Sequence, residues 1–309
     1  MIEIQELTKR YGSTVAVDDL SFSVKSGTVT GFLGPNGAGK STTMRITMGL
    51  DHPLRGRVLL DGKRYGQLRE PIRHVGALLE AKAAQRSRTA YHHLLWLAQT
   101  NRIGRGRVRE VLELVGLESA AARRAGGFSL GMSQRLGLAA ALLGDPGILI
   151  LDEPANGLDP EGVRWIRTML KKLAAEGRTV FVSSHLMSEM AITADHLIVI
   201  GRGRLLADTS MAGFIADHCR PSVRIRTPQP GLLRAALEEA GLHAVREVDG
   251  TMTVEGADTS VIGRIAADNG ITLDELSARQ SSLEEAFLRL TSHAAEYRAA
   301  ATVAGERAS

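Results

Sequence analysis

The chain has 309 residues, of which 44% are hydrophobic and 23% are charged, and its formal net charge is +4 at pH 7. This length predicts about two globular domains. The single cysteine, Cys219, excludes an internal disulfide and indicates a reducing compartment. No apolar run reaches the length of a membrane span and no signal pattern opens the chain, so we expect a soluble or peripheral protein without a lipid anchor.

The first predicted elements are two strands. Residues 2–5 and 20–24 alternate polar and apolar side chains with a period of two. Tyr11 lies between them. An aromatic ring at this place could stack on a nucleotide base, whereas burial in a core is the more common role of such a ring. The residues alone leave both interpretations open.

A glycine-rich loop follows the next strand. Residues 28–33 are typical of a buried strand, and residues 34–42, Gly-Pro-Asn-Gly-Ala-Gly-Lys-Ser-Thr, match the G-x-x-x-x-G-K-[ST] pattern of phosphate-binding loops. Glycine permits backbone conformations in which successive N–H groups turn toward one anion, and a helix that begins at about Lys40 adds positive charge there. We expect Lys40 to reach the β- and γ-phosphates and Ser41 to hold Mg²⁺.

The middle of the chain changes from strands to helices. Strand-like segments cover residues 56–62 and 74–79, and the second of them ends on Glu80. Residues 88–124 carry helical periodicity, with apolar side chains at 108, 111, 112 and 115. Glycines and Ser129 then precede a helical run at 136–143. This composition suits either a phosphate-binding helix start or an ordinary serine N-cap.

Two acidic residues end the next apolar strand. Four branched aliphatic residues at 148–151 predict a buried parallel strand, which runs into Asp152 and Glu153. A carboxylate at such a strand end serves Mg²⁺ in phosphate-binding-loop enzymes, and its neighbour could polarise the attacking water. A turn with Asp159 and a helix at 161–175 follow. A strand at 179–184 then delivers His185 to its carboxyl end, where ligands bind in open α/β sheets.

The order of these motifs resembles the ATP-binding subunit of ABC transporters. The resemblance covers residues 1 to about 215 and is closest to the bacterial drug- and antibiotic-export group, including the daunorubicin- and bacitracin-resistance ATPases. It implies an α/β P-loop NTPase fold of the ABC ATPase type over residues 1–218. That fold has a RecA-like core, an antiparallel β subdomain and an inserted helical subdomain at about 84–144.

The resemblance also implies roles for individual residues. Glu153 corresponds to the general base, His185 to the switch histidine that senses the γ-phosphate, and Lys40 to the catalytic lysine. The implied Mg²⁺ ligands are Ser41, Asp152 and Glu80, of which Glu80 occupies the family's Q-loop glutamine position. The implied ATP-binding residues are Tyr11, Gly34, Pro35, Asn36, Gly37, Ala38, Gly39, Lys40, Ser41, Thr42, Glu80, Ser129, Gly131 and Asp159.

Two positions depart from the family pattern. The signature Leu-Ser-Gly-Gly-Gln is replaced at 128–132 by Phe-Ser-Leu-Gly-Met, which keeps Ser129 and Gly131 but loses the first glycine and the glutamine. Glu80 adds a negative charge beside the phosphates, although a carboxylate can still hold Mg²⁺ through water. We expect Glu80 to keep the metal and coupling role of the glutamine.

The function implied by the resemblance is ATP-driven export. Two copies would close head to tail on two ATP molecules and drive a separate multi-span permease at the cytoplasmic face of the membrane, with drugs, antibiotics or peptides as cargo. The alternative is a soluble ABC ATPase that acts on nucleic acid or ribosomes. A single P-loop, one cysteine and the lack of sustained heptads disfavour it, and scattered arginines without interleaved aromatics indicate no nucleic-acid partner. A third possibility is a module that sequesters a drug directly, but no drug pocket is evident.

The C-terminal third restarts with a different pattern. Residues 221–292 read as βαββαβ with a turn at Asp249-Gly250, which predicts a small α+β ferredoxin-like domain. Ser282 and Glu285 form a capping-box pattern before the last helix. This part resembles the C-terminal extension of the drug-export ATPases and is expected to serve dimerisation or regulation. The Ala-rich residues 293–309 are expected to fray.

Overall fold

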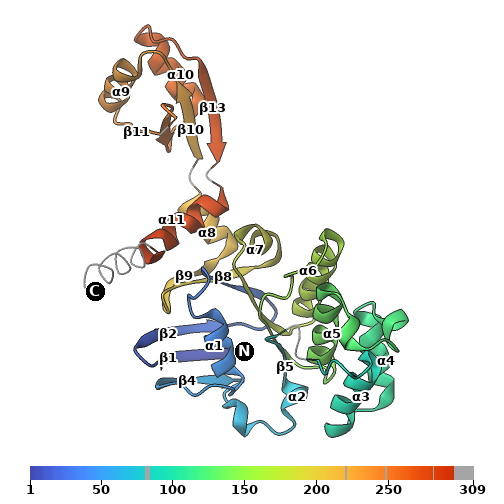
Figure 1. Cartoon of the computed structure of the whole chain (residues 1–309). Coiled ribbons are helices and arrows are strands. Elements are labelled where there is room, and N and C mark those ends of the chain that lie inside the picture. Colours follow the sequence, from blue (N-terminus) through green and yellow to red (C-terminus); the bar gives the residue numbers. More distant parts are fainter. Residues whose placement is uncertain (81–83, 220, 248, 281, 296–309) are drawn as a thin grey trace, which may run out of the picture. The chain divides into compact units, whose positions relative to one another are not determined.

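The computed structural model describes residues 1–80, 84–219, 221–247, 249–280 and 282–295 (Figure 1). The chain divides into two compact units, Ala212–Arg289 and the remainder, Met1–Met211 with the chain from Leu290. Helix α8 (Met211–His218) therefore groups with the second unit, although the sequence places a boundary near residue 218. The expected frayed tail lies mostly outside the described residues.

The first unit is built on a six-stranded sheet. Its strand order is β5-β6-β7-β3-β8-β9, and every neighbouring pair is parallel except β8 with β9. The three central strands β3, β6 and β7 are buried along their whole length, and β6 is the continuous aliphatic run typical of a strand covered on both faces. The strands are β3 (Val29–Leu33), β5 (Val75–Leu78), β6 (Ile148–Leu151), β7 (Thr179–Ser184), β8 (His196–Gly201) and β9 (Arg204–Ser210).

A second, antiparallel sheet packs into the same core. Its order is β2-β1-β4, formed by β1 (Ile2–Tyr11), β2 (Thr14–Val24) and β4 (Arg55–Leu60). The Phe22 ring lies 5.4 Å from Phe32, which in turn lies 5.0 Å from Phe181, measured between ring centroids. These aromatic contacts bury side chains of both sheets in one cluster. The strands are longer than the sequence predicts because β-bulges interrupt the period-two pattern of β1.

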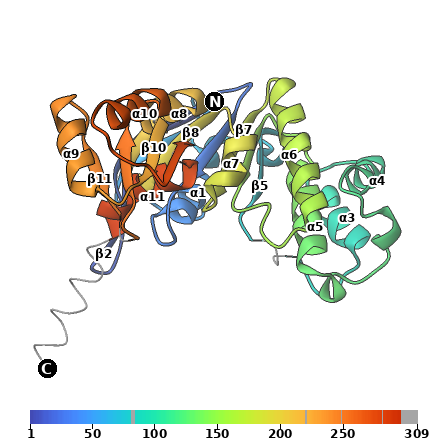
Figure 2. The same cartoon turned by 90° about the horizontal axis from the view of Figure 1, so that it is seen from above.

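Seven α-helices in the described part of the first unit accompany these sheets. Among them, α3, α4 and α5 group together beside α6 (Figure 2). Val108, Val111 and Leu112 are buried, as the helical periodicity predicts. Helix α5 begins at Leu130, six residues earlier than the apolar run alone predicts, because Ser129 caps it. The helices are α1 (Lys40–Thr47), α2 (Pro71–His74), α3 (Ala90–Thr100), α4 (Arg105–Leu114), α5 (Leu130–Leu142), α6 (Pro160–Ala175) and α7 (Met187–Thr193).

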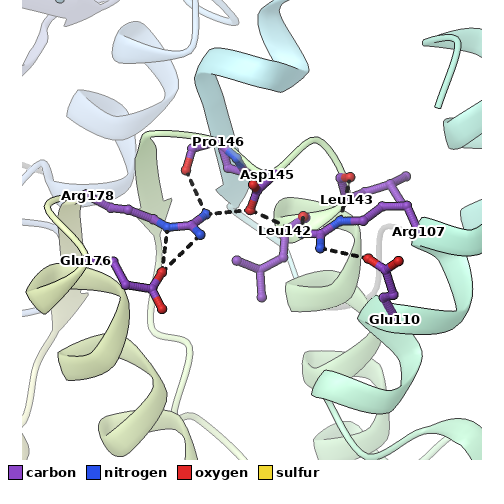
Figure 3. A network of polar contacts seen from close by, with 8 residues as sticks. All are labelled: Arg107, Glu110, Leu142, Leu143, Asp145, Pro146, Glu176 and Arg178. Atoms are coloured by element: carbon purple, nitrogen blue, oxygen red, sulfur yellow. Dashed lines mark hydrogen bonds and ion pairs between the residues drawn. The ribbon is translucent and has the colours of Figure 1, made fainter. Parts of the chain in front are cut away.

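A polar network joins α4 to the start of β6 and the end of α6 (Figure 3). The Arg107 guanidinium donates to the carbonyls of Leu142, at 2.9 Å, and Leu143, at 3.3 Å, which end α5. Asp145 accepts from Arg107 at 3.3 Å and from Arg178 at 2.9 Å. Carbonyls at a helix C-terminus lack intrahelical donors, so these bonds satisfy groups that would otherwise need water.

We expect the Arg107→Ala variant to lower the free energy of unfolding by about 1–2 kcal/mol, because several charge-assisted hydrogen bonds are lost together. Urea denaturation measures the change. Arg105→Ala is the matched control, since Arg105 is an exposed residue of the same helix, and its expected effect is within about 0.5 kcal/mol. Equal losses in the two variants would contradict the role of the network.

The second unit contains a four-stranded antiparallel sheet with the order β11-β12-β10-β13. Its elements run βαββαβ along the chain, as expected, and α9 and α10 bury Leu233, Leu237 and Ile262 against the sheet. Glu285 and Ser282 exchange the two capping-box hydrogen bonds, at 3.1 and 3.2 Å. Besides α8, the elements are β10 (Pro221–Arg226), α9 (Pro230–Glu239), β11 (Ala244–Arg246), β12 (Met252–Glu255), α10 (Thr259–Asp268), β13 (Glu275–Gln280) and the first half of α11 (Leu283–Ala295), which passes into the first unit at Leu290.

Candidate functional site

The glycine-rich loop connects β3 to α1 at the carboxyl edge of the parallel strands. A Cβ atom on Gly34 would lie 2.5 Å from the Ile200 carbonyl oxygen, and one on Gly39 would lie 2.4 Å from the Ala16 carbonyl oxygen. Gly39 also has a φ of 104°, a left-handed conformation that favours glycine. The loop residues 36–42, Ala16 and Glu153 line a pocket of about 170 Å³. The backbone thus forms a small concave surface. A side chain larger than that of glycine would collide with a carbonyl oxygen at either position.

Lys40 is enclosed by this loop. Its side chain is buried, and its Nζ donates to the carbonyls of Gly34, at 2.6 Å, and Pro35, at 3.3 Å. Burial lowers the pKa of Lys40, whereas the nearby Glu153 and Asp152 carboxylates act to raise it. An ammonium group has three N–H donors, so one remains for an anion in the pocket.

Asp152 and Glu153 follow β6 and face the same region. The Ser183 hydroxyl donates to the Asp152 carboxylate and accepts from the Glu153 backbone N–H at 2.9 Å. Glu153 has a φ of 47°, which is uncommon outside glycine and is typical of functional sites. One serine of the neighbouring strand β7 therefore holds the Asp152 carboxylate and the backbone of Glu153.

His185 stands at the end of β7 beside Glu153. Its Nδ1 lies 3.0 Å from Glu153 Oε1, and both side chains remain partly exposed. Glu153 also lines the pocket of the glycine-rich loop. The loop after β3, the end of β6 and the end of β7 thus bring Lys40, Glu153 and His185 to one edge of the sheet, as the sequence predicts.

Two polar residues at this site have no role assigned by the sequence. Ser183 contacts the Asp152 carboxylate and the Glu153 backbone N–H, but it is one of three polar residues in β7 and carries no local signal of this role. The buried Gln134 of α5 donates from Nε2 to the carbonyls of Glu153, at 3.3 Å, and Asn156, at 3.2 Å. Gln134 carries no local sequence signal, because its partners lie in a distant loop.

Tyr11 ends β1 and is 48% exposed, which favours a ring available to a ligand over a core aromatic. Its hydroxyl donates to Asp51 Oδ2 at 3.0 Å, and Lys9 Nζ lies 5.0 Å from the ring centroid. Burial and the Asp51 carboxylate raise the pKa of Tyr11, against a hydrogen bond with the Thr42 hydroxyl that lowers it. Tyr11 therefore lies beside the end of the glycine-rich loop.

Glu80 lies just after β5 and is exposed. Together with Ser41 and Asp152 it lines a larger pocket of about 680 Å³. The three implied metal ligands thus share one cavity. Their hydroxyl and carboxylate oxygens are the kind of donor that Mg²⁺ prefers, with substrate phosphates completing the shell.

Ser129, Gly131 and Asp159 line neither the phosphate-loop pocket nor the larger pocket of the same chain. Ser129 Oγ accepts from the Met132 N–H at 3.2 Å and so acts as an ordinary N-cap of α5. Gly131 lies in the first turn of that helix and is half-buried. The Asp159 carboxylate accepts from the Gly162 N–H at 2.9 Å and caps α6.

Comparisons with known proteins agree with this geometry. A family model described as "ABC transporter" matches residues 17–156, and a domain of unknown function matches residues 221–284. An uncharacterised ABC transporter ATP-binding protein of Bacillus subtilis is 35% identical over 96% of this chain and 97% of its own length. The bacitracin transport ATP-binding protein of Bacillus licheniformis is 35% identical over 94% of this chain and 97% of its own length.

Solved structures agree as well. The dimeric structure of a bacterial ABC transporter cassette has a TM-score of 0.63 and 26% identity, covering 68% of this chain and 99% of that one. A dimeric post-hydrolysis state with bound ADP and phosphate has a TM-score of 0.62 and 27% identity, again over 68% and 99% of the two chains. The predicted ABC ATPase fold is confirmed by these matches. The chain belongs to the family of ABC transporter ATP-binding proteins and is an ATPase of that family.

Proposed function

We propose that this chain is the ATP-hydrolysing subunit of an exporter of drugs, antibiotics or peptides. The position of Glu153 supports ATP hydrolysis, because this residue lines the phosphate-loop pocket and its carboxylate lies 3.0 Å from His185 Nδ1. The export part is supported by relatives named for bacitracin transport and for lantibiotic transport, the latter 34% identical over 69% of this chain.

The triphosphate of ATP would bind over the glycine-rich loop. Backbone N–H groups of residues 36–42 and the N-terminus of α1 attract its oxygens, and Lys40 supplies a fixed cation. The exposed Tyr11 ring would stack on adenine. Ser41, Asp152 and Glu80 would hold Mg²⁺, which when bound neutralises charge on the phosphate oxygens.

Hydrolysis would use the residues after β6 and β7. Glu153 orients the attacking water and accepts its proton at a carboxylate oxygen. His185 holds that carboxylate through Nδ1 and would sense the γ-phosphate. The Ser183 hydroxyl fixes Asp152 and the Glu153 backbone, so the two acids keep separate tasks at adjacent positions.

A second copy of the chain would complete the site. Ser129, Gly131 and Asp159 lie outside the phosphate-loop pocket of their own chain, and Ser129 and Asp159 are exposed. In a head-to-tail dimer, each copy would bring these residues to the ATP bound by the other copy, so that the two copies close on each other when ATP is bound. The dimeric cassettes among the structural neighbours support this arrangement.

The force of closure would pass to a separate multi-span permease at the cytoplasmic face of the membrane. Among the described helices, none is both long and apolar enough to cross a bilayer. The 680 Å³ pocket offers an attachment surface, since its rim includes Trp96, 47% exposed, and Leu50, 58% exposed. Exposed apolar side chains around a cavity are typical of a binding surface for a protein segment.

The test is to solubilise native membranes, isolate a tagged copy of the chain and identify what accompanies it. We expect a multi-span membrane protein in comparable amount, and its loss in the Trp96→Glu variant. Leu114→Glu is the matched control, because Leu114 is also exposed but does not line the pocket. Recovery of ribosomes or nucleic acid instead would refute the transporter assignment and favour the soluble alternative.

A further inference from the structure

A buried side-chain amide contacts the turn that carries Glu153. Gln134 lies in the second turn of α5 and is 6% exposed. Its Nε2 donates to the carbonyl oxygen of Glu153 at 3.3 Å and to that of Asn156 at 3.2 Å. A backbone carbonyl only accepts hydrogen bonds, so the amide turns its NH₂ group toward these oxygens, and both of its N–H donors are in use.

The two carbonyls belong to the ends of a single turn. The Asn156 N–H donates to the Glu153 carbonyl at 3.1 Å and closes this turn. Gln134 bonds to the first and the last residue of the turn, and two bonds fix its orientation relative to α5 where one would leave it free to rotate. Leu130 of the same helix packs against the next residue, Gly157, because a Cβ atom there would collide with the Leu130 side chain. The turn is thus fastened to α5 by polar and apolar contacts.

The backbone of Glu153 is fixed from both sides. Its φ of 47° is a left-handed conformation that glutamate rarely adopts and that persists only where the surroundings determine it. The Glu153 N–H donates to the Ser183 hydroxyl of β7 at 2.9 Å, and the Glu153 carbonyl is held by Gln134 of α5. From this fixed backbone the carboxylate lies 3.0 Å from His185 Nδ1, and Glu153 lines the phosphate-loop pocket. A shift of either peptide group would therefore move the carboxylate.

We propose that Gln134 is a positioning residue for Glu153: it holds the turn after β6 so that the Glu153 carboxylate stays in the phosphate-loop pocket beside His185. The proposal rests on the proposed role of Glu153 in ATP hydrolysis and deepens it, because it names a side chain that aims this carboxylate. Gln134 itself lines neither the phosphate-loop pocket nor the larger pocket. Its loss is therefore expected to slow hydrolysis and to leave ATP binding nearly unchanged.

Four full-length proteins test this role: the wild type, Gln134→Met, Glu153→Gln and the double variant. Methionine has nearly the size of glutamine but no N–H donor. We expect Gln134→Met to slow single-turnover hydrolysis of ATP by about tenfold, with the dissociation constant of ATP from titration calorimetry within about threefold of the wild type. In the Glu153→Gln background the same substitution is expected to slow hydrolysis by no more than about twofold, because the carboxylate that Gln134 positions is already absent.

Two further variants separate the amide donors from general packing. Gln134→Glu keeps the shape but sets a carboxylate against the same two carbonyl oxygens, so it is expected to slow hydrolysis more than Gln134→Met does. Arg135→Met is the matched control. Arg135 is the next residue of α5, and it donates to the Val115 carbonyl at 2.9 Å instead of to the turn. Its loss is expected to leave hydrolysis within about twofold of the wild type.

Each outcome decides for or against the role of Gln134. An equal slowing by Gln134→Met in both backgrounds, or a rate within about twofold of the wild type, would overturn it. A melting temperature of nucleotide-free Gln134→Met far below that of Arg135→Met would also overturn it, because the amide would then serve folding. Hydrolysis by Glu153→Gln at the wild-type rate would instead refute the proposed role of Glu153.

Discussion

The Glu153→Gln variant is expected to bind ATP as the wild type does and to hydrolyse it about 10²- to 10³-fold more slowly. A carboxamide has nearly the shape of a carboxylate but cannot accept the proton of the attacking water. The phosphate-loop contacts and Lys40 are untouched by the change. Phosphate release gives the turnover number, and calorimetry gives the dissociation constant of ATP.

A carboxylate elsewhere on the same unit serves as the control. Glu176 lies at the end of α6, pairs with Arg178 at 3.1 Å and does not line the phosphate-loop pocket. Glu176→Gln is expected to leave turnover within about twofold of the wild type. Turnover of the Glu153→Gln variant within a few-fold of the wild type would show that another group accepts the proton.

The second large effect is expected from Lys40→Met. Methionine keeps the length and burial of the side chain but removes the ammonium, so the triphosphate loses a fixed cation in a partly desolvated pocket. We expect ATP binding to weaken by about 10²-fold or more and hydrolysis to fall below detection. The change in fluorescence of a bound ATP analogue measures the affinity.

The stability of this variant provides an internal check. Burial lowers the pKa of Lys40, which means that the folded protein bears a desolvation penalty for the charged group. Removing the ammonium is therefore not expected to lower the melting temperature of the nucleotide-free protein, although two hydrogen bonds to carbonyls are lost. If instead the variant melts well below the wild type, its loss of binding reflects unfolding rather than the missing cation.

The local parts of the site could be predicted from the sequence because each depends on contiguous residues. Each of these parts follows directly on a strand: the glycine-rich loop follows β3, the two acids follow β6 and His185 follows β7. In a parallel sheet, such strand ends meet at one edge whatever the strand order. Lys40, Glu153 and His185 therefore converge as expected.

Contacts between distant segments could not be predicted in the same way. The roles of Ser183 and Gln134 depend on which loop lies beside which strand, and neither residue differs locally from an ordinary polar side chain. The same is true of the link from Arg107 through Asp145 to Arg178 (Figure 3). The left-handed backbone of Glu153 also follows from tertiary packing, since glutamate has no preference for it.

Strand β3 lies between two strands that come much later in the sequence, and this position constrains when β3 can fold during synthesis. Val29 pairs with Val180 of β7, and Thr30 pairs with His196 of β8, so both neighbours of β3 are translated long after the glycine-rich loop that follows it. A chain emerges from the ribosome with its N-terminus first. A nascent chain that stops before residue 179 contains the whole phosphate-binding motif but lacks the sheet that supports it. Nucleotide can therefore assist only the last stage of folding of the first unit, once β7 and β8 have left the ribosome.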